Sequence, residues 1–159
     1  MSEADQSFAK ELVTGVYRYL SLLDFFIDAC SSRPVRRIDS LPLWILRLSI
    51  YQMHFLRTPS YAAVHEGVEL CRTLGQSRAG GFVNAVLREF DRKEPQPPEG
   101  NSAKELGLRF GHPEWLVRRY LERDGLEVTL DRLRRQNRPP PSVIWVNRFK
   151  IELQDFVER

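Results

Sequence analysis

One apolar stretch, residues 41–56 (LPLWILRLSIYQMHFL), constrains the fold more than any other part of the chain. Ser40 is able to cap a helix there, and Pro42 falls in its first turn, where a missing N–H group costs no hydrogen bond. From Leu43 onward nearly every residue is apolar, so this helix needs neighbours on several sides. The sequence therefore predicts a helical domain with this helix at its centre.

A few polar residues interrupt the central helix. Arg47 and His54 are seven positions apart and share one face, whereas Ser49 and Gln52 share another. We therefore predict that a polar stripe carries Arg47 outward to solvent.

The chain is long enough for one modest domain and part of a second, with 159 residues. No apolar run reaches the roughly 18 residues of a membrane span, and no basic and apolar signal segment opens the chain, so we expect a cytoplasmic protein with no membrane partner. Cys30 and Cys71 stand alone, which favours buried, reduced thiols over a disulfide or a zinc site.

Basic residues are concentrated in the middle of the chain. The net charge is +3, yet residues 31–93 contain most of the positive excess, and arginine far outnumbers lysine. Arginine makes bidentate contacts to phosphate and stacks on bases, so the pattern is compatible with nucleic-acid binding. Genomic base composition explains the same bias without any function, and composition alone does not separate the two explanations.

The first predicted helix runs from about residue 5 or 7 to Cys30, with apolar residues at helical spacing. Gly15 and Ser21 indicate a close crossing or a bend that divides it into two helices. The loop at residues 31–39 then gathers Arg33, Arg36 and Arg37, a cationic surface that suits a nucleic-acid backbone. Such a loop is also typical of an ordinary solvated surface.

A third helix is predicted from Ser60 to Leu74. It contains His65-Glu66, but position 69 is glutamate where a zinc protease motif needs a second histidine, so we reject a metal centre. A glycine-rich turn then leads into a helix over residues 81–90. The glycine-rich start of this helix is suited either to phosphate binding or to close packing against another helix. We expect the Asn84 side chain on this helix to be buried and to have a structural role.

Proline-rich, charged sequence over residues 92–104 predicts a linker between a helical domain at 1–91 and a second segment at 105–159. Ser102 and Glu105 form a capping box for a short helix, and further helices are expected on either side of Gly125. Residues 142–147 (SVIWVN) are β-branched and aromatic, which predicts a single strand that begins a truncated α+β domain.

Several stretches, in their order along the chain, are similar to those of one known family. They are ILRLSIYQMHFL, YAAVHEGVELC, AGGFVNAVLREF, HPEWLVRRYL and QNRPPPSVIWVNRFK. The chain thereby resembles, over about residues 7–150, the NusB-like domain and following segment of bacterial ribosomal RNA cytosine C5 methyltransferases, the Sun or Fmu proteins. The resemblance implies an all-α helical bundle that binds RNA and proteins.

Two departures from that family matter. The family usually begins with an additional helix, and its absence here would expose apolar surface that a second copy of the chain could cover. The family's S-adenosylmethionine loop and its Pro-Cys nucleophile are also absent, because Cys30 follows alanine and Cys71 follows leucine. We therefore expect no catalysis and no cofactor in this chain, with S-adenosylmethionine belonging to a missing catalytic domain.

The resulting hypothesis is a non-catalytic module that binds ribosomal RNA for a 16S-type cytosine C5 methyltransferase. The candidate phosphate contacts, chosen on charge and predicted exposure, are Arg33, Arg36, Arg37, Arg47, Arg78, Arg88, Arg92 and Lys93. The alternative is a transcription antitermination or protein-interaction module, which docks a ribosomal or transcription protein or pairs with itself. A third possibility is a segment that only stabilises the missing catalytic domain. The sequence does not identify the RNA site or the oligomeric state.

Overall fold

The computed structural model describes residues 2–138, 145–147, 149, 150 and 154. The elements follow one another as α1 (Glu3–Arg18), α2 (Leu20–Cys30), η1 (Val35–Arg37), α3 (Ser40–Phe55), α4 (Ser60–Thr73), η2 (Ser77–Ala79), α5 (Gly80–Lys93), α6 (Ala103–Phe110) and α7 (Glu114–Gln136). Every regular element in the described part of the chain is helical, which confirms the predicted all-α class.

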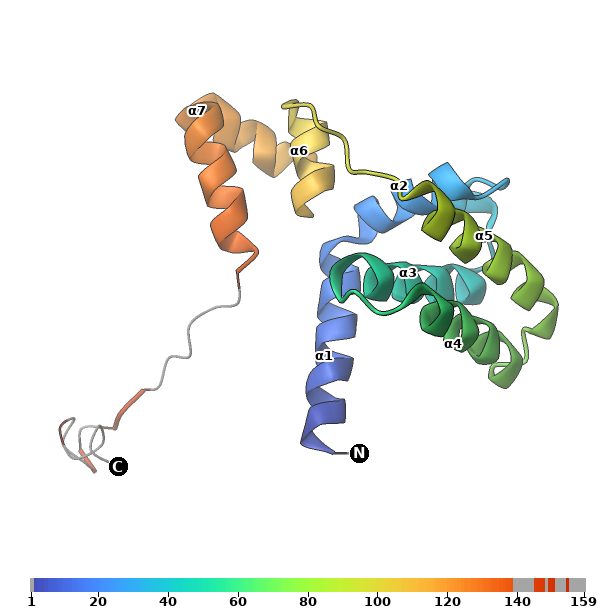
Figure 1. Ribbon diagram of the computed structural model, residues 1–159. Helices are drawn as coiled ribbons and strands as arrows, with labels where there is room; N and C mark the ends of the chain where they lie inside the picture. Colours follow the sequence, from blue (N-terminus) through green and yellow to red (C-terminus); the bar gives the residue numbers. More distant parts are fainter. Residues whose placement is uncertain (1, 139–144, 148, 151–153, 155–159) are drawn as a thin grey trace.

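Helix α3 lies at the centre of the bundle, as its apolar sequence predicts. It packs against α1, α2, α4 and α5, and its Ile45, Leu46 and Ile50 are almost completely buried (Figure 1). Ser40 is its first helical residue and not its cap, because Asp39 occupies the N-cap position without a side-chain hydrogen bond. The core around α3 also takes Phe26 from α2 and Leu87 and Phe90 from α5.

The first predicted helix is divided in two at Tyr19, whose backbone is not helical. The Tyr19 ring stacks on Phe55 with ring centroids 4.2 Å apart, which fixes the bend against the end of α3. Gly15 marks a close crossing of α1 and α3, because a methyl group added there would overlap the ring of Tyr51. The expected bend and the expected close crossing are both present.

Replacing Gly15 with alanine is expected to lower the free energy of unfolding by about 1–2 kcal/mol. Alanine favours a helix over glycine by up to about 1 kcal/mol. However, the Tyr51 ring is buried and its hydroxyl donates a 2.7 Å hydrogen bond to Glu11, so the ring has little room to move. Urea denaturation measures the difference. Gly81→Ala on α5, with open space around it, is the matched control and is expected to stabilise the chain; equal effects of the two substitutions would contradict the tight crossing.

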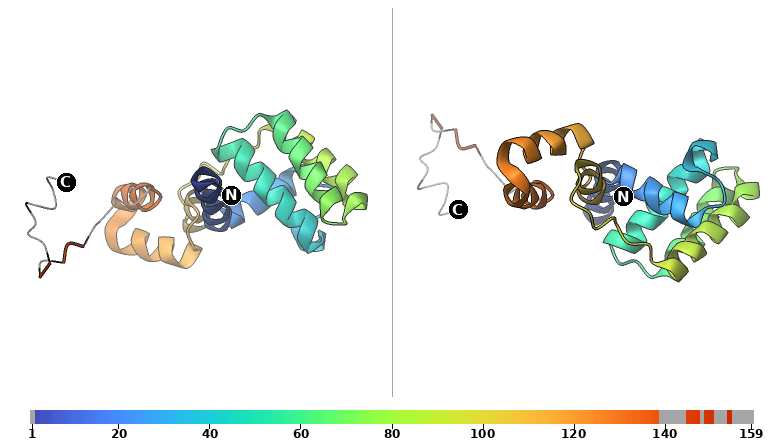
Figure 2. Two further views of the ribbon diagram at one scale, coloured as in Figure 1. Left: turned by 90° about the horizontal axis from the view of Figure 1, so that it is seen from below. Right: turned by 90° about the horizontal axis from the view of Figure 1, so that it is seen from above.

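Beyond α5 the chain forms a second, smaller helical unit. Residues 94–102 contain no helix, and α6 then begins with the predicted capping box of Ser102 and Glu105. Helix α6 packs on α7, which bends sharply at Gly125 (φ 74°, ψ 176°). In both views of Figure 2 the α6–α7 unit lies to one side of the main bundle, and α6 contacts α2. The division into domains at 1–91 and 105–159 stays a prediction.

The predicted strand at residues 142–147 is not seen. Residues 145–147 have no strand conformation, and residues 142–144 lie outside the described residues. The physical reason is the lack of a partner, because a strand is stabilised by ladder hydrogen bonds to a neighbouring strand, and no other strand occurs among the described residues.

Candidate nucleic-acid interface

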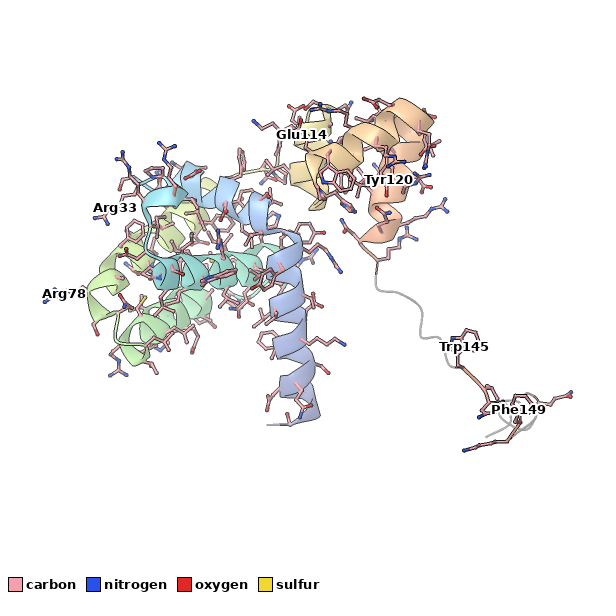
Figure 3. All side chains as sticks on the ribbon, turned by 180° about the vertical axis from the view of Figure 1, so that it is seen from behind. Arg33, Arg78, Glu114, Tyr120, Trp145 and Phe149 are labelled. Atoms are coloured by element: carbon pink, nitrogen blue, oxygen red, sulfur yellow. The ribbon has the colours of Figure 1, made fainter. Side chains whose placement is uncertain are left out.

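Two loops at one end of the bundle bring arginines together. Arg33, Arg36 and Arg37 come from the connection between α2 and α3, and Arg78 comes from η2, more than 40 positions later. Arg33 and Arg78 line one shallow depression of about 330 Å³. Both project from the same edge of the bundle in Figure 3. The fold thus assembles a cationic surface from segments that are far apart in the sequence.

The backbone of the first arginine-bearing loop is held in place by local hydrogen bonds. Ser31 Oγ accepts from the Arg33 N–H (3.0 Å) and donates to the Arg33 carbonyl (2.8 Å), which closes a tight turn. The Val35 N–H donates to Asp28 Oδ1 at 2.7 Å, which ties the loop to α2. Val35 and Ile38 pack against the core. The loop therefore presents its arginines from a fixed backbone.

Five of the eight candidate residues are exposed and free of carboxylate partners. They are Arg33, Arg36, Arg37, Arg78 and Arg88, none of which forms an ion pair within the described parts of the chain. Arg88 lies on α5 and does not line the depression. Unpaired guanidinium groups remain available for phosphate oxygens.

The predicted exposure of Arg47 to solvent is wrong. Its guanidinium is buried and binds both carboxylate oxygens of Asp24 on α2, each at 2.8 Å, and it lies over the Trp44 ring at 4.7 Å from the centroid. The helical spacing correctly places Arg47 on a polar stripe, but α2 covers that stripe and supplies the counter-charge. Arg47 therefore holds α3 to α2, and its pairing with Asp24 argues against a role in binding phosphate.

Arg92 and Lys93 are exposed but already paired. Arg92 binds Glu89 at 2.7 Å, and Lys93 binds Glu89 at 3.1 Å and donates to the Ala29 carbonyl at 2.8 Å. The hydrogen bond from Arg92, assisted by Lys93, lowers the pKa of the Glu89 carboxyl to about 2. This carboxylate offsets local positive charge, and Lys93 joins the end of α5 to the end of α2.

Phe82 is a site residue that is not among the candidates predicted from the sequence. It is only half-buried on the first turn of α5, lines the depression and has the Arg33 guanidinium 5.4 Å from its ring centroid. The glycine-rich start of the helix was the available signal. Asn84, expected to be buried, is exposed instead, because the core side of α5 consists of Val83, Val86 and Leu87.

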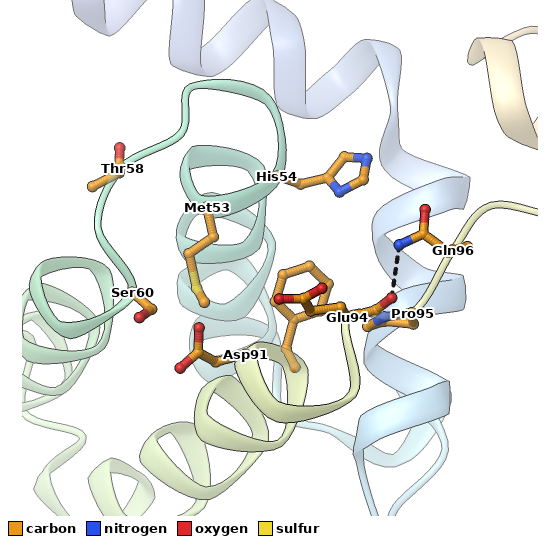
Figure 4. Close-up of a pocket in the computed structure, with 9 residues that line it drawn as sticks. Met53, His54, Thr58, Ser60, Asp91, Glu94, Pro95 and Gln96 are labelled. Atoms are coloured by element: carbon orange, nitrogen blue, oxygen red, sulfur yellow. Dashed lines mark hydrogen bonds between the residues drawn. The ribbon is translucent and has the colours of Figure 1, made fainter.

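A second depression, of about 290 Å³, has the opposite character (Figure 4). Asp91 and Glu94 line it together with His54, and Gln96 donates to the Glu94 carbonyl at 2.8 Å. Burial lowers the pKa of His54, so the imidazole is neutral at pH 7 and does not offset the two carboxylates. An RNA backbone would be repelled here, which distinguishes this depression from the cationic one.

The expected apolar surface lies along α1. Phe8, Val13 and Tyr17 are exposed, and Tyr17 packs beside Trp44 of α3 with ring centroids 5.5 Å apart. Whether a second copy of the chain covers this surface stays a prediction. None of the helices in the described ranges is both long enough and apolar enough to cross a bilayer.

The two cysteines have no features of a nucleophile. Burial raises the pKa of the Cys71 thiol, and it also raises that of Cys30, where nearby Lys93 only partly opposes it. An attacking cysteine needs the opposite, a thiolate stabilised at neutral pH. Neither cysteine lines the cationic depression.

Comparison with known proteins agrees with the helical architecture. The NusB family matches residues 1–92. The probable ribosomal RNA small subunit methyltransferase B of Bacillus subtilis is 28% identical over 162 aligned positions, covering the whole of this chain and 36% of that protein. The ribosomal RNA small subunit methyltransferase B proteins of Escherichia fergusonii and Escherichia coli O1:K1 are each 30% identical over 93% of this chain and 34% of their own length.

The chain thus spans about a third of the length of the curated relatives it matches. The family match covers the bundle from α1 to Arg92 in the last turn of α5, including both arginine-bearing loops. On this match, the chain belongs to the NusB family.

Proposed function

We propose that this chain is a cytoplasmic ribosomal RNA-binding module that positions RNA for cytosine C5 methylation and does no chemistry itself. The observation that carries the proposal is that two distant loops bring the exposed Arg33 and Arg78 to one depression, and neither arginine forms an ion pair among the described residues. Phosphate contacts from such groups supply a large share of the affinity of proteins that bind nucleic acids. The relatives' designation as ribosomal RNA methyltransferases supports ribosomal RNA as the class of ligand.

Catalysis and S-adenosylmethionine binding belong, in this proposal, to the part of the relatives that this chain does not span. The described residues supply neither a strand followed by a glycine-rich loop nor an activated cysteine. They do not fit the cofactor, so no step of the methyl transfer is assigned to them.

Replacing both Arg36 and Arg37 with alanine is expected to weaken binding to a small-subunit ribosomal RNA fragment about tenfold at 0.1 M salt. Each lost phosphate contact should also reduce the slope of log K against log salt by about 0.7–0.9. Titrations by fluorescence anisotropy at several salt concentrations measure both quantities. Base preference should change little, because phosphate contacts contain no sequence information.

The matched control removes two arginines elsewhere. Arg118→Ala with Arg119→Ala on α7 lowers the net charge equally but leaves the cationic loops intact. Equal losses in the two double variants would mean that only overall charge matters. An unchanged affinity and slope for the Arg36 and Arg37 variant would overturn the assignment of this loop.

A protein-contact role is the competing function. It predicts no binding to RNA even at low salt, with the arginines serving only as solvated charge. The paired state of Arg92 and Lys93 shows how part of the basic excess is used within the fold. The loop arginines form no ion pair with any described carboxylate, which favours RNA as the ligand.

A further inference from the structure

We propose that the depression between η1 and η2 is a pocket for one unpaired nucleobase, which stacks on Phe82 while the surrounding arginines bind its flanking phosphates. This inference rests on the proposed RNA-binding function and specifies its ligand as RNA with an unpaired nucleotide. It assigns a role to Phe82, Asp39 and Gln76, which phosphate binding alone leaves unused.

The lining of the depression matches the two halves of a nucleotide. Its apolar part consists of Ile38, Pro42, Ala79 and the half-buried ring of Phe82, and its rim has the guanidinium groups of Arg33 and Arg78. A flat base is apolar on its faces, whereas the phosphates on either side are anionic. The volume of about 330 Å³ is at the lower end of the ~300–1,000 Å³ range of small-molecule sites.

The Arg33 guanidinium and the Phe82 ring already form a pair of stacking groups. Their separation is 5.4 Å, and Arg33 has no carboxylate partner among the described residues that would hold it there. Unpaired RNA bases stack on aromatic rings and on arginine planes. The exposed Arg33 side chain can therefore move aside to admit a base and then cover its outer face.

Asp39 argues for a base and against a bare phosphate. Asp39 lines the depression, its side chain makes no capping hydrogen bond to α3, and its negative charge would oppose an anion bound there. A carboxylate instead accepts hydrogen bonds from exocyclic amino groups, as on cytosine. Gln76 offers both a donor and an acceptor beside it. The pocket should thus prefer bases that carry an amino group over uracil.

A continuous duplex does not fill such a pocket. Bases in A-form RNA are stacked inside the helix, and proteins reach base faces in loops, bulges and ends. The Phe82 ring suits one nucleotide turned out of the stack, with its flanking phosphates bound by Arg33 from one loop and Arg78 from the other.

The test compares three hairpins of equal charge: one with a single unpaired cytidine, one with an abasic nucleotide at that position, and one with uridine there. Anisotropy titrations of the unaltered chain are expected to give about tenfold tighter binding to the cytidine hairpin than to the abasic one, with the uridine hairpin between them. All three salt slopes should be the same, because the phosphates are unchanged. Equal affinity for the cytidine and abasic hairpins would overturn the proposal without any protein variant.

Two substitutions test which residues of the depression produce the preference among the hairpins. Phe82→Leu keeps an apolar side chain and is expected to remove the advantage of the cytidine hairpin while preserving the salt slope. Asp39→Asn is expected to remove the preference for cytidine over uridine. If the Phe82→Leu variant binds all three hairpins as tightly as the unaltered chain, the proposed base pocket is wrong. The proposed phosphate contacts would still be supported if the Arg36 and Arg37 variant loses RNA affinity. Absence of any RNA binding would overturn both.

Discussion

Arg47→Ala is expected to lower the free energy of unfolding by about 3 kcal/mol. Removing one partner of a buried ion pair typically costs about 3–5 kcal/mol, since the remaining charge loses its compensation. The value here lies at the lower end because Asp24 keeps 28% of its side chain exposed, against 11% for Arg47. The substitution also removes the guanidinium that packs on the Trp44 ring. Chemical denaturation followed by circular dichroism measures the loss.

Arg88→Ala is the matched control, because Arg88 is exposed and forms no ion pair within the described residues. Its effect on stability should stay within about 0.5 kcal/mol. Arg47→Lys should recover only part of the loss, because lysine cannot form the two parallel hydrogen bonds to Asp24. If Arg47→Ala unfolded no more easily than the unaltered chain and instead reduced the salt slope of RNA binding, Arg47 would be a phosphate contact after all.

The burial of Arg47 could not be predicted from the sequence. Helical periodicity places a residue on a face of its own helix, but it does not say which neighbouring helix covers that face. The partner, Asp24, is 23 positions earlier and on another helix, so no local pattern links the two. Arg92 and Lys93 show a milder case, since their shared partner Glu89 lies within one helical turn and the pairing could have been anticipated.

The helices themselves were largely predictable because their signals are local. The apolar run of α3, the capping box at Ser102 and the glycine at position 125 each act within a few residues. The predicted strand used local signals too, but a strand depends on a partner that a propensity pattern does not provide. The positive charge of the candidate site could be predicted from the arginines in the sequence. Its aromatic platform was missed because helical spacing cannot distinguish a half-buried Phe82 from a core residue.

Leu133→Ala is expected to unfold the α6–α7 unit while leaving the bundle folded. The buried residues of this unit's own core are Leu106, Val117 and Leu133, so each one supplies a large share of its stability. Truncating a fully buried leucine costs about 2–5 kcal/mol, which we expect to exceed the free energy of unfolding that so small a core provides. The bundle core around Phe26 includes none of the three, and its amides should retain their hydrogen-exchange protection while those of α6 and α7 lose it.

The outcome depends on how strongly the two units are coupled. Leu108 of α6 packs against the bundle core, and Gly111 passes so close to the Arg18 carbonyl that no side chain would fit. These contacts are few, so we expect separate loss of protection and a division of the chain between α5 and α6. Leu126→Ala, on α7 but 38% exposed, should leave protection unchanged. Simultaneous loss of protection in α2–α5 and in α6–α7 would instead mean that the whole chain unfolds as one cooperative unit, with residues 94–102 a connection inside a single domain.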